Sequence, residues 1–90
     1  MNSDVDFILG EDRHVKLYVH SVKDEYVAIA SASYELLLDG DIEDSGSCVI
    51  DGQYIDMKLN PLHKSRAYIL EVTCAIADEV RKKRLSIGVK

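Results

Sequence analysis

The residues that most often carry chemistry in proteins are scattered along this chain rather than grouped in motifs. Its histidines are His14, His20 and His63, and its cysteines are Cys48 and Cys74. His14 and His20 would share one face of a strand, but six strand residues separate them by roughly 20 Å, beyond a common metal-coordination sphere. We therefore predict no metal site built on these histidines.

No motif places a nucleophile beside a base, which nucleophilic catalysis requires. The serines at 31, 33, 45 and 47 lie in strand or turn segments, and the Gly-x-Ser-x-Gly elbow does not occur. A phosphate cradle needs a glycine-rich loop at a helix N-terminus, whereas Ser45-Gly46-Ser47 leads into an expected strand. We predict no catalytic residue and no cofactor, so the protein is expected not to be an enzyme.

The segment Asp39–Asp44 has acidic alternation like part of a calcium loop. Its glycine is in the wrong place for an EF-hand, and the later bidentate glutamate is missing. We predict an acidic hairpin loop here, with weak calcium binding as the alternative.

The net charge of −5 disfavours a nucleic-acid-binding role, because such binding uses many Lys or Arg contacts to phosphate. The exception is the basic run Arg81-Lys82-Lys83-Arg84. On a strand these side chains alternate between the two faces, and lysines on an edge strand commonly block unwanted strand pairing. A solvated edge is the favoured interpretation, and a polyanion site is the alternative.

Alternation of apolar and polar residues is the main structural signal, since successive side chains of a strand point to opposite faces. It is clearest in Arg13–His20 and recurs in Gln53–Leu59. The pairs Asp39-Gly40 and Asp51-Gly52 favour tight turns, because both residue types tolerate positive φ. These turns predict chain reversal after residues 34–38 and a hairpin before Gln53–Leu59.

The C-terminal third alternates as well, from Tyr68 to Ile76 and again over Leu85, Ile87 and Val89. Val80 is out of phase with the last three residues, which predicts a bulge or bend near Lys82. Helical spacing also fits parts of residues 24–38 and 66–84. The sequence therefore predicts one all-β antiparallel sandwich domain spanning residues 1–90, with an α+β fold as the alternative.

Some apolar residues fall on the faces opposite the expected core, and exposed apolar side chains that cluster often mark interaction patches. These are Tyr18, Tyr54 and Ile69, and Arg81 and Lys83 join them as candidate interface residues.

No stretch is apolar enough for a membrane span, and the N-terminal residues lack the pattern of a secretory signal. We expect a reducing cytosol, with Cys48 and Cys74 as buried thiols rather than a disulfide.

Five segments, in their order along the chain, resemble a known class of module. They are Gly10-Glu11-Asp12, residues 34–40, Asp51-Gly52-Gln53-Tyr54, residues 68–73 and Leu85-Ser86-Ile87-Gly88-Val89. These modules are the short immunoglobulin-like sandwiches of tailed-phage and prophage virion proteins, including the N-terminal domain of baseplate upper proteins. The resemblance implies a sandwich of about seven strands.

The resemblance also implies that Tyr68 is a tyrosine corner, a fold residue whose hydroxyl bonds upstream backbone. The entry into its strand departs from the usual Pro-Gly, because His63-Lys64-Ser65-Arg66 stands there.

The implied function is that of a non-enzymatic structural or adaptor component of a phage or prophage particle, present in the host cytoplasm during assembly and then in the virion. Its expected partners are other protein subunits, in a homo-oligomer or with phage structural proteins, and neither nucleic acid nor membrane. A small ligand- or carbohydrate-binding sandwich is the alternative, weakened by the absence of Trp and the single Phe.

Overall fold

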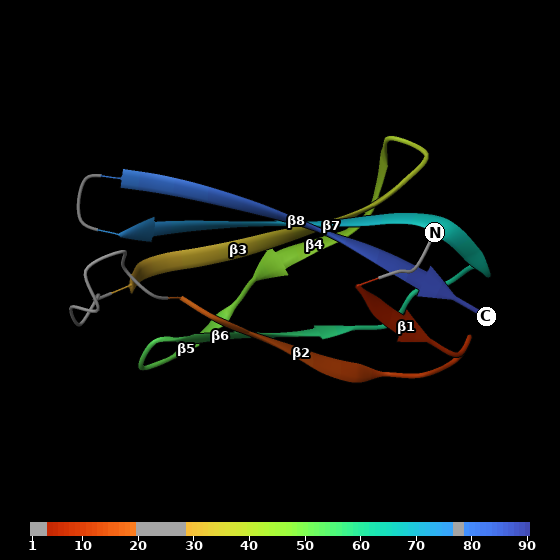
Figure 1. The fold of residues 1–90 in the computed structure, drawn as a ribbon, viewed down its shortest axis with the longest axis horizontal. Helices are drawn as coiled ribbons and strands as arrows, with labels where there is room; N and C mark the ends of the chain where they lie inside the picture. Colours follow the sequence, from red (N-terminus) through yellow and green to blue (C-terminus); the bar gives the residue numbers. More distant parts are fainter. Residues whose placement is uncertain (1–3, 20–28, 77–78) are drawn as a thin grey trace.

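The computed structural model describes residues 4–19, 29–76 and 79–90, and in these residues it contains strands and no helix (Figure 1). The strands are β1 (Val5–Phe7), β2 (Arg13–Tyr18), β3 (Ile29–Leu38), β4 (Asp41–Ser47), β5 (Val49–Asp51), β6 (Tyr54–Leu59), β7 (Ser65–Ile76) and β8 (Glu79–Val89). The predicted all-β fold is confirmed. None of the described residues belongs to a helix that could cross a membrane.

The helical alternative is wrong over residues 29–38, 66–76 and 79–84, which are strands. Its remaining residues, 24–28 and 77–78, lie outside the described residues. β7 shows why the period of two prevails. Its core-facing side buries Tyr68, Leu70, Val72, Cys74 and Ile76, while the residues between them are only half-buried. A helix would have spread these apolar side chains over more than one face.

The strands form two sheets that pack face to face as a β-sandwich. The larger sheet has the order β1-β8-β7-β3-β4, and the smaller has the order β2-β6-β5. All pairings are antiparallel except that of β1 with β8. The chain changes sheet at Cys48, between β4 and β5. The spatial orders β2-β6-β5 and β8-β7-β3-β4 are those of strands B-E-D and G-F-C-C′ in immunoglobulin-like sandwiches.

The described residues form eight strands, one more than the approximate seven that the sequence suggested. β1 is the short strand that the alternation did not predict. It lies parallel to the end of β8 and places Phe7 in the core, where its side chain is 1% exposed.

Both predicted turns occur. Asp39 and Gly40, with φ of 53° and 87°, are the two central residues between β3 and β4, and positive φ at both positions is the type I′ geometry that matches strand twist. In the second hairpin Asp51 pairs with Tyr54, so Gly52 and Gln53 make the turn. The φ of Gly52 is 61°.

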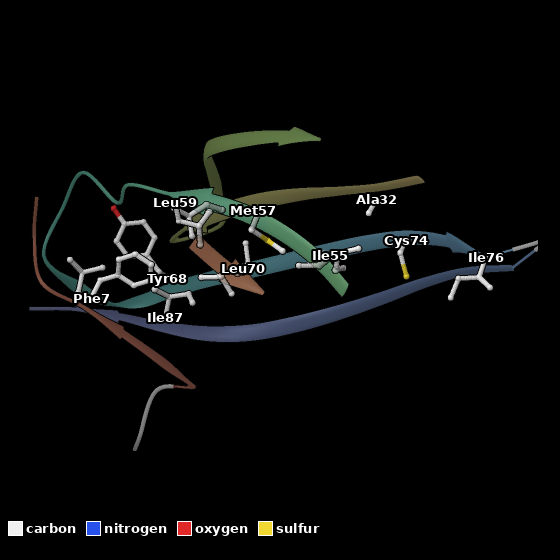
Figure 2. Close-up of a cluster of buried hydrophobic side chains, with 14 residues drawn as sticks. Phe7, Ala32, Ile55, Met57, Leu59, Tyr68, Leu70, Cys74, Ile76 and Ile87 are labelled. Carbon is white, nitrogen blue, oxygen red and sulfur yellow. The ribbon is translucent and has the colours of Figure 1, made fainter. Parts of the chain in front are cut away.

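The core lies between the two sheets (Figure 2). Its buried residues are Phe7, Val15, Ala32, Leu36, Ile55, Met57, Leu59, Tyr68, Leu70, Val72, Cys74, Ile76, Ile87 and Val89. Every one is apolar except for the tyrosine hydroxyl and the cysteine thiol. Removing such surface from water is the main driving force for packing the sheets.

The bulge predicted near Lys82 is wrong. β8 pairs with β7 without a register shift from Glu79 to Ile87, and the irregularity in this pairing lies between Ser65 and Tyr68. The prediction assumed that Val80 must face the core. Its side chain is instead on the outer face and 67% exposed.

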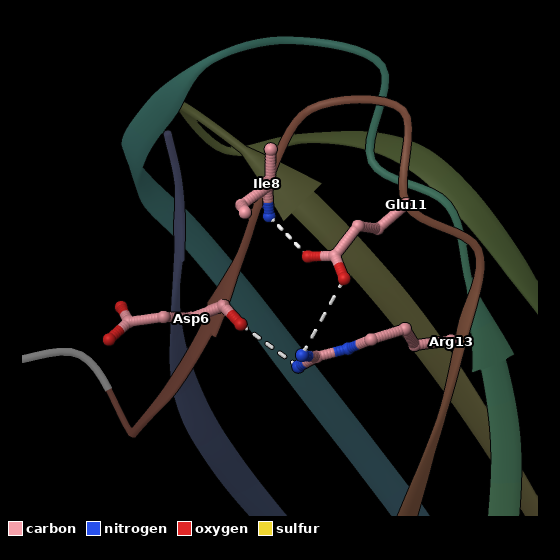
Figure 3. Close-up of polar contacts among 4 residues, drawn as sticks. All are labelled: Asp6, Ile8, Glu11 and Arg13. Carbon is pink, nitrogen blue, oxygen red and sulfur yellow. Dashed lines mark hydrogen bonds and ion pairs between the residues drawn. The ribbon is translucent and has the colours of Figure 1, made fainter.

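A polar network ties β1 to the start of β2 (Figure 3). The Arg13 guanidinium donates to the Asp6 carbonyl oxygen at 2.9 Å and lies 4.4 Å from the centre of the Phe7 ring. The Ile8 amide donates to Glu11 Oε1 at 2.6 Å, and the other Glu11 oxygen is 3.9 Å from Arg13. These contacts fix the connection that carries the chain from the larger sheet to the smaller one.

Candidate interaction surface

Tyr18 and Tyr54 form an exposed aromatic pair on the outer face of the smaller sheet. They are directly opposite each other in the β2–β6 ladder, and their ring centroids are 5.2 Å apart with a 50° tilt. Their side chains are 54% and 48% exposed. The Tyr18 hydroxyl donates to Gln53 Oε1 at 3.2 Å, which steadies the ring. Tyrosine, with an apolar ring and a polar hydroxyl at its end, is a typical anchor of protein interfaces.

The basic run of β8 alternates between faces. Arg81 and Lys83 lie opposite Cys74 and Val72 in the β7–β8 ladder, so they share the core-facing side of the sheet. All four basic residues are exposed. Arg81 also contacts Glu79, with 3.3 Å between Nη2 and Oε2.

Lys82 and Arg84 lie on the outer face and both pair with Glu71 of β7. The Lys82 Nζ and Arg84 Nε atoms are 3.6 Å and 2.8 Å from the two Glu71 oxygens. The hydrogen bond from Arg84, followed by the charges of Arg84 and Lys82, lowers the pKa of Glu71. Arg81, Lys82 and Arg84, three of the four residues of the basic run, thus have an acidic partner within the molecule, which leaves less positive charge for a polyanion.

A groove of about 210 Å³ opens between β2 and β6 on one side and β7 and β8 on the other. It is lined by Leu17, Tyr18, Val19, Ile55, Val72, Cys74, Arg81, Lys82 and Lys83. The floor is apolar and the β8 side is basic. Its volume is below the roughly 300 Å³ at which pockets for drug-sized molecules begin.

The structure brings four of the five candidate interface residues to one region. Tyr18, Arg81 and Lys83 line the groove, and Tyr54 is paired with Tyr18. Ile69 lies elsewhere. It is half-buried on the outer face of the larger sheet, opposite Leu37 and Ser86, so it does not join the others.

The predicted acidic hairpin loop is wrong beyond its turn. Only Asp39 and Gly40 turn the chain, and Asp41 to Asp44 belong to β4. A register shift leaves Glu43 as an extra residue between Asp44 and Ile42, which pair with Leu36 and Leu37. This bulge puts Asp41 and Asp44 on the same side of the sheet as core-facing Leu38 and Leu36. Sequence alternation alone had missed this arrangement.

The bulge also directs Glu43 toward Tyr68, as bulges commonly re-aim side chains. The Tyr68 hydroxyl donates to Glu43 Oε1 at 2.8 Å and accepts a hydrogen bond from the His63 amide at 3.1 Å. Bonding of the hydroxyl to backbone five residues upstream is the contact of a tyrosine corner. The Nε2 atom of His63 is 3.7 Å from Glu43 Oε1.

Tyr68 is fully buried, and this burial, reinforced by the Glu43 carboxylate, raises its pKa to about 12. The other Glu43 oxygen is buried and has no hydrogen-bond partner. The cluster therefore holds a neutral tyrosine that fastens the β6–β7 connection to β4. Glu43 is the partner that sequence reasoning missed, since nothing local links it to a residue 25 positions away.

Metal-binding and thiol chemistry have little support in the described ranges 4–19, 29–76 and 79–90. No group of three His, Cys, Asp or Glu residues there is placed to hold a metal ion, and His20 lies outside those ranges. Cys48 and Cys74 are free. Burial raises the pKa of Cys48, which disfavours the reactive thiolate.

No family model, curated protein or solved structure matches this chain. The likeness to phage sandwich modules thus stays a prediction from the sequence. What the protein does has to be inferred from the surfaces of its sandwich.

Proposed function

We propose that the protein is a non-enzymatic structural or adaptor module of a phage or prophage particle, acting by assembly with other protein subunits. The virion setting rests on the sequence resemblance alone. The mode of action rests on a feature of the fold, namely the edges of the larger sheet.

Two strands of that sheet have long stretches with no pairing neighbour among the described residues. β1 pairs with Ile87–Val89 of β8, and Asp4 is hydrogen-bonded to the Ser86 backbone, which leaves Glu79–Leu85 as an edge. β4 closes the other side of the sheet along Asp41–Ser47. Unpaired N–H and C=O groups on such edges are ready to pair with another chain, and strand addition is a recurrent mode of protein recognition.

The aromatic pair provides a second support. Tyr18 is on β2, one of the two edge strands of the smaller sheet, and Tyr18 also lines the groove beside β8. A partner that contacted this side of the sandwich would cover an exposed edge, an apolar floor and two tyrosines together. Tyrosine is enriched among the few residues that dominate binding energy at interfaces.

The test is sedimentation velocity over a wide range of concentrations, on the protein alone and mixed with structural proteins encoded beside it. We expect self-association or a defined complex. The double variant Tyr18→Ser/Tyr54→Ser should weaken that association about tenfold or more, as loss of an interface anchor does. Ile69→Ser, on the outer face of the other sheet, is the matched control and should associate as the wild type does. A protein that stays monomeric and binds none of these proteins would contradict the proposal.

The groove favours one alternative, a small ligand- or carbohydrate-binding sandwich. Its apolar floor and basic side fit a small anionic molecule better than a neutral sugar, because Tyr18 provides the only aromatic ring among the described residues that line it. Nuclear magnetic resonance titration with a fragment library, together with a glycan array, distinguishes this alternative. Shifts confined to groove residues at low ligand concentration would favour it, and their absence would leave the assembly function.

A further inference from the structure

The two edges of the larger sheet carry opposite charge. β8 has the basic residues Arg81, Lys82, Lys83 and Arg84, and β4 has the acidic residues Asp41 and Asp44. We infer that the partner of the β8 edge is the β4 edge of a second copy of this chain, so that the sheet continues from one copy to the next. This rests on the proposed assembly function and specifies its surfaces.

Strand direction is compatible with this contact. β8 is antiparallel to β7, β7 to β3, and β3 to β4, so β8 and β4 run in opposite directions. A second copy that continues the sheet in the same orientation brings its β4 to β8 as an antiparallel neighbour. Antiparallel pairs form direct inter-strand hydrogen bonds without needing any crossover connection.

The spacing of the charges matches as well. Arg81 and Lys83 are two residues apart on the core-facing side of β8, opposite Cys74 and Val72. The bulge at Glu43 likewise places Asp41 and Asp44 on the core-facing side of β4, opposite Leu38 and Leu36, which are two residues apart. Both pairs are thus about 7 Å apart along their strands. In an antiparallel contact Asp41 meets Lys83 when Asp44 meets Arg81.

The charged side chains of the two edges are accessible to a second copy of the chain. Asp41 and Lys83 are exposed, and Asp44 is half-buried. Asp44 accepts hydrogen bonds from Tyr34 and from the Ser45 amide, and Arg81 contacts Glu79, so these two residues already have partners. The exposed ion pair of Arg81 with Glu79 can be exchanged at little cost, since such a pair contributes at most about 1 kcal/mol.

An incoming β4 would also lie beside the apolar groove, whose β8 side is made by Arg81, Lys82 and Lys83. The contact joins two different surfaces of the same chain, so it is heterologous and repeats at every copy. Such head-to-tail contacts close into rings or extend as filaments. The twist between neighbouring strands adds a constant rotation at each step.

Two charge-reversed variants test the inference through their mixture. One carries Arg81→Glu and Lys83→Glu, which makes the core-facing side of both edges acidic. The other carries Asp41→Lys and Asp44→Lys, which makes both edges basic. Each alone should have its self-association weakened about tenfold or more, and an equimolar mixture should assemble again, because each acidic edge then finds a basic one. Light scattering after size exclusion measures all three samples, and wild-type assembly should weaken as salt is raised.

The single swaps Lys83→Glu and Asp41→Lys repeat the test without touching Asp44, whose contact with Tyr34 supports the fold. Lys64→Glu/Arg66→Glu is the control for net charge, since both residues are exposed and distant in sequence from either edge. It should assemble as the wild type does.

Three results overturn the edge pairing. If both folded variants still assemble alone, the assembly function stands but uses another surface. If each variant is monomeric and the mixture stays monomeric as well, opposite charge on these edges is not what joins the copies. A wild type that is monomeric at every concentration also overturns the edge pairing, while its binding to other structural proteins then decides the proposed function separately.

Discussion

At the scale of single residues, Tyr68 combines a buried ring with a hydroxyl that makes two hydrogen bonds. It fills space between the sheets, and its hydroxyl joins the β6–β7 connection to β4 through the His63 amide and Glu43. Immunoglobulin domains place a cysteine two residues after the corner tyrosine. Here Leu70 stands at that position and is fully buried, so apolar packing replaces a cross-link between the sheets.

Replacing Tyr68 by Phe should lower the free energy of unfolding by about 1 to 3 kcal/mol, because it leaves buried Glu43 without its donor. Urea denaturation followed by circular dichroism measures this. Tyr54→Phe is the control and should change stability by less than about 0.5 kcal/mol, since Tyr54 is exposed. Equal effects of the two changes would show that the Tyr68 hydroxyl has no structural role.

The same tyrosine should make stability depend on alkaline pH. Its pKa is about 12 in the folded protein against 10.0 for an unperturbed tyrosine. A group whose folded pKa is raised contributes stability that is complete below the unfolded pKa and is lost as pH rises toward the folded value. The stability difference between wild type and Tyr68→Phe should thus be constant below about pH 9 and shrink above pH 10. A difference that grows in that range would contradict the assignment.

At the scale of elements, hairpins and cross-strand pairs fix the register of the larger sheet. The Asp39-Gly40 turn sets how β4 meets β3, and this register in turn places the bulge at Glu43. On the outer face, Glu71 of β7 joins Arg84 and Lys82 of β8. Both features hold an edge strand in position, so local changes there should act on the assembly surfaces as well as on stability.

Gly40→Ala should destabilise the protein by about 1 kcal/mol or more, because a φ of 87° is unfavourable for any residue with a Cβ atom. Thermal unfolding measures the change. Gly40→Asn should restore part of the loss, since asparagine tolerates positive φ better than alanine. If Gly40→Ala and Gly40→Asn lose the same stability, the positive φ of Gly40 is not the cause of the loss.

Glu71→Gln should lower stability at neutral pH, because it removes the acceptor of Arg84 and Lys82. The pKa of Glu71 is lowered in the folded protein, so its contribution is complete above the ordinary value of 4.5 and is lost as pH falls through the lowered one. The difference from wild type should vanish in acid. Glu35→Gln is the control: Glu35 lies directly opposite Glu71, and removing that like charge should not reduce stability.

At the scale of the whole molecule, a short chain depends on one core between its two sheets. A domain of this size has a net stability of about 5 to 15 kcal/mol, so the loss of one large core side chain is a large fraction of it. Leu70 is at the centre of this core and is fully buried.

Leu70→Ala should reduce the free energy of unfolding by about 2 to 5 kcal/mol, through lost burial and the cavity left behind. Ile69→Ala, one residue away on the outer face of the same strand, should cost much less because Ile69 is only half-buried. Chemical denaturation of both variants gives the comparison. Similar losses would mean that the two faces of β7 do not differ as described.

The sequence by itself determined the strands with regular alternation and the turns between them. Apolar residues at every second position specify which side of β2, β6 and β7 is buried, and an aspartate-glycine pair specifies where the chain reverses. These signals are local, because they depend on the pleat of one strand and on the φ angles of one or two residues. They also placed Arg81 and Lys83 on one face and Tyr18 and Tyr54 on another.

Only the tertiary structure decided which segments become neighbours. β4 has a polar sequence with weak strand preference, and it is a strand because β3 supplies its hydrogen-bond partners. β1 pairs with β8 across some 80 residues, and Glu43 meets Tyr68 only through a bulge. The period of the apolar pattern shows which face of a strand a side chain occupies, but not which residue it contacts. Partners are chosen by the packing of the common core, and that packing set the acidic β4 and the basic β8 on opposite edges of one sheet.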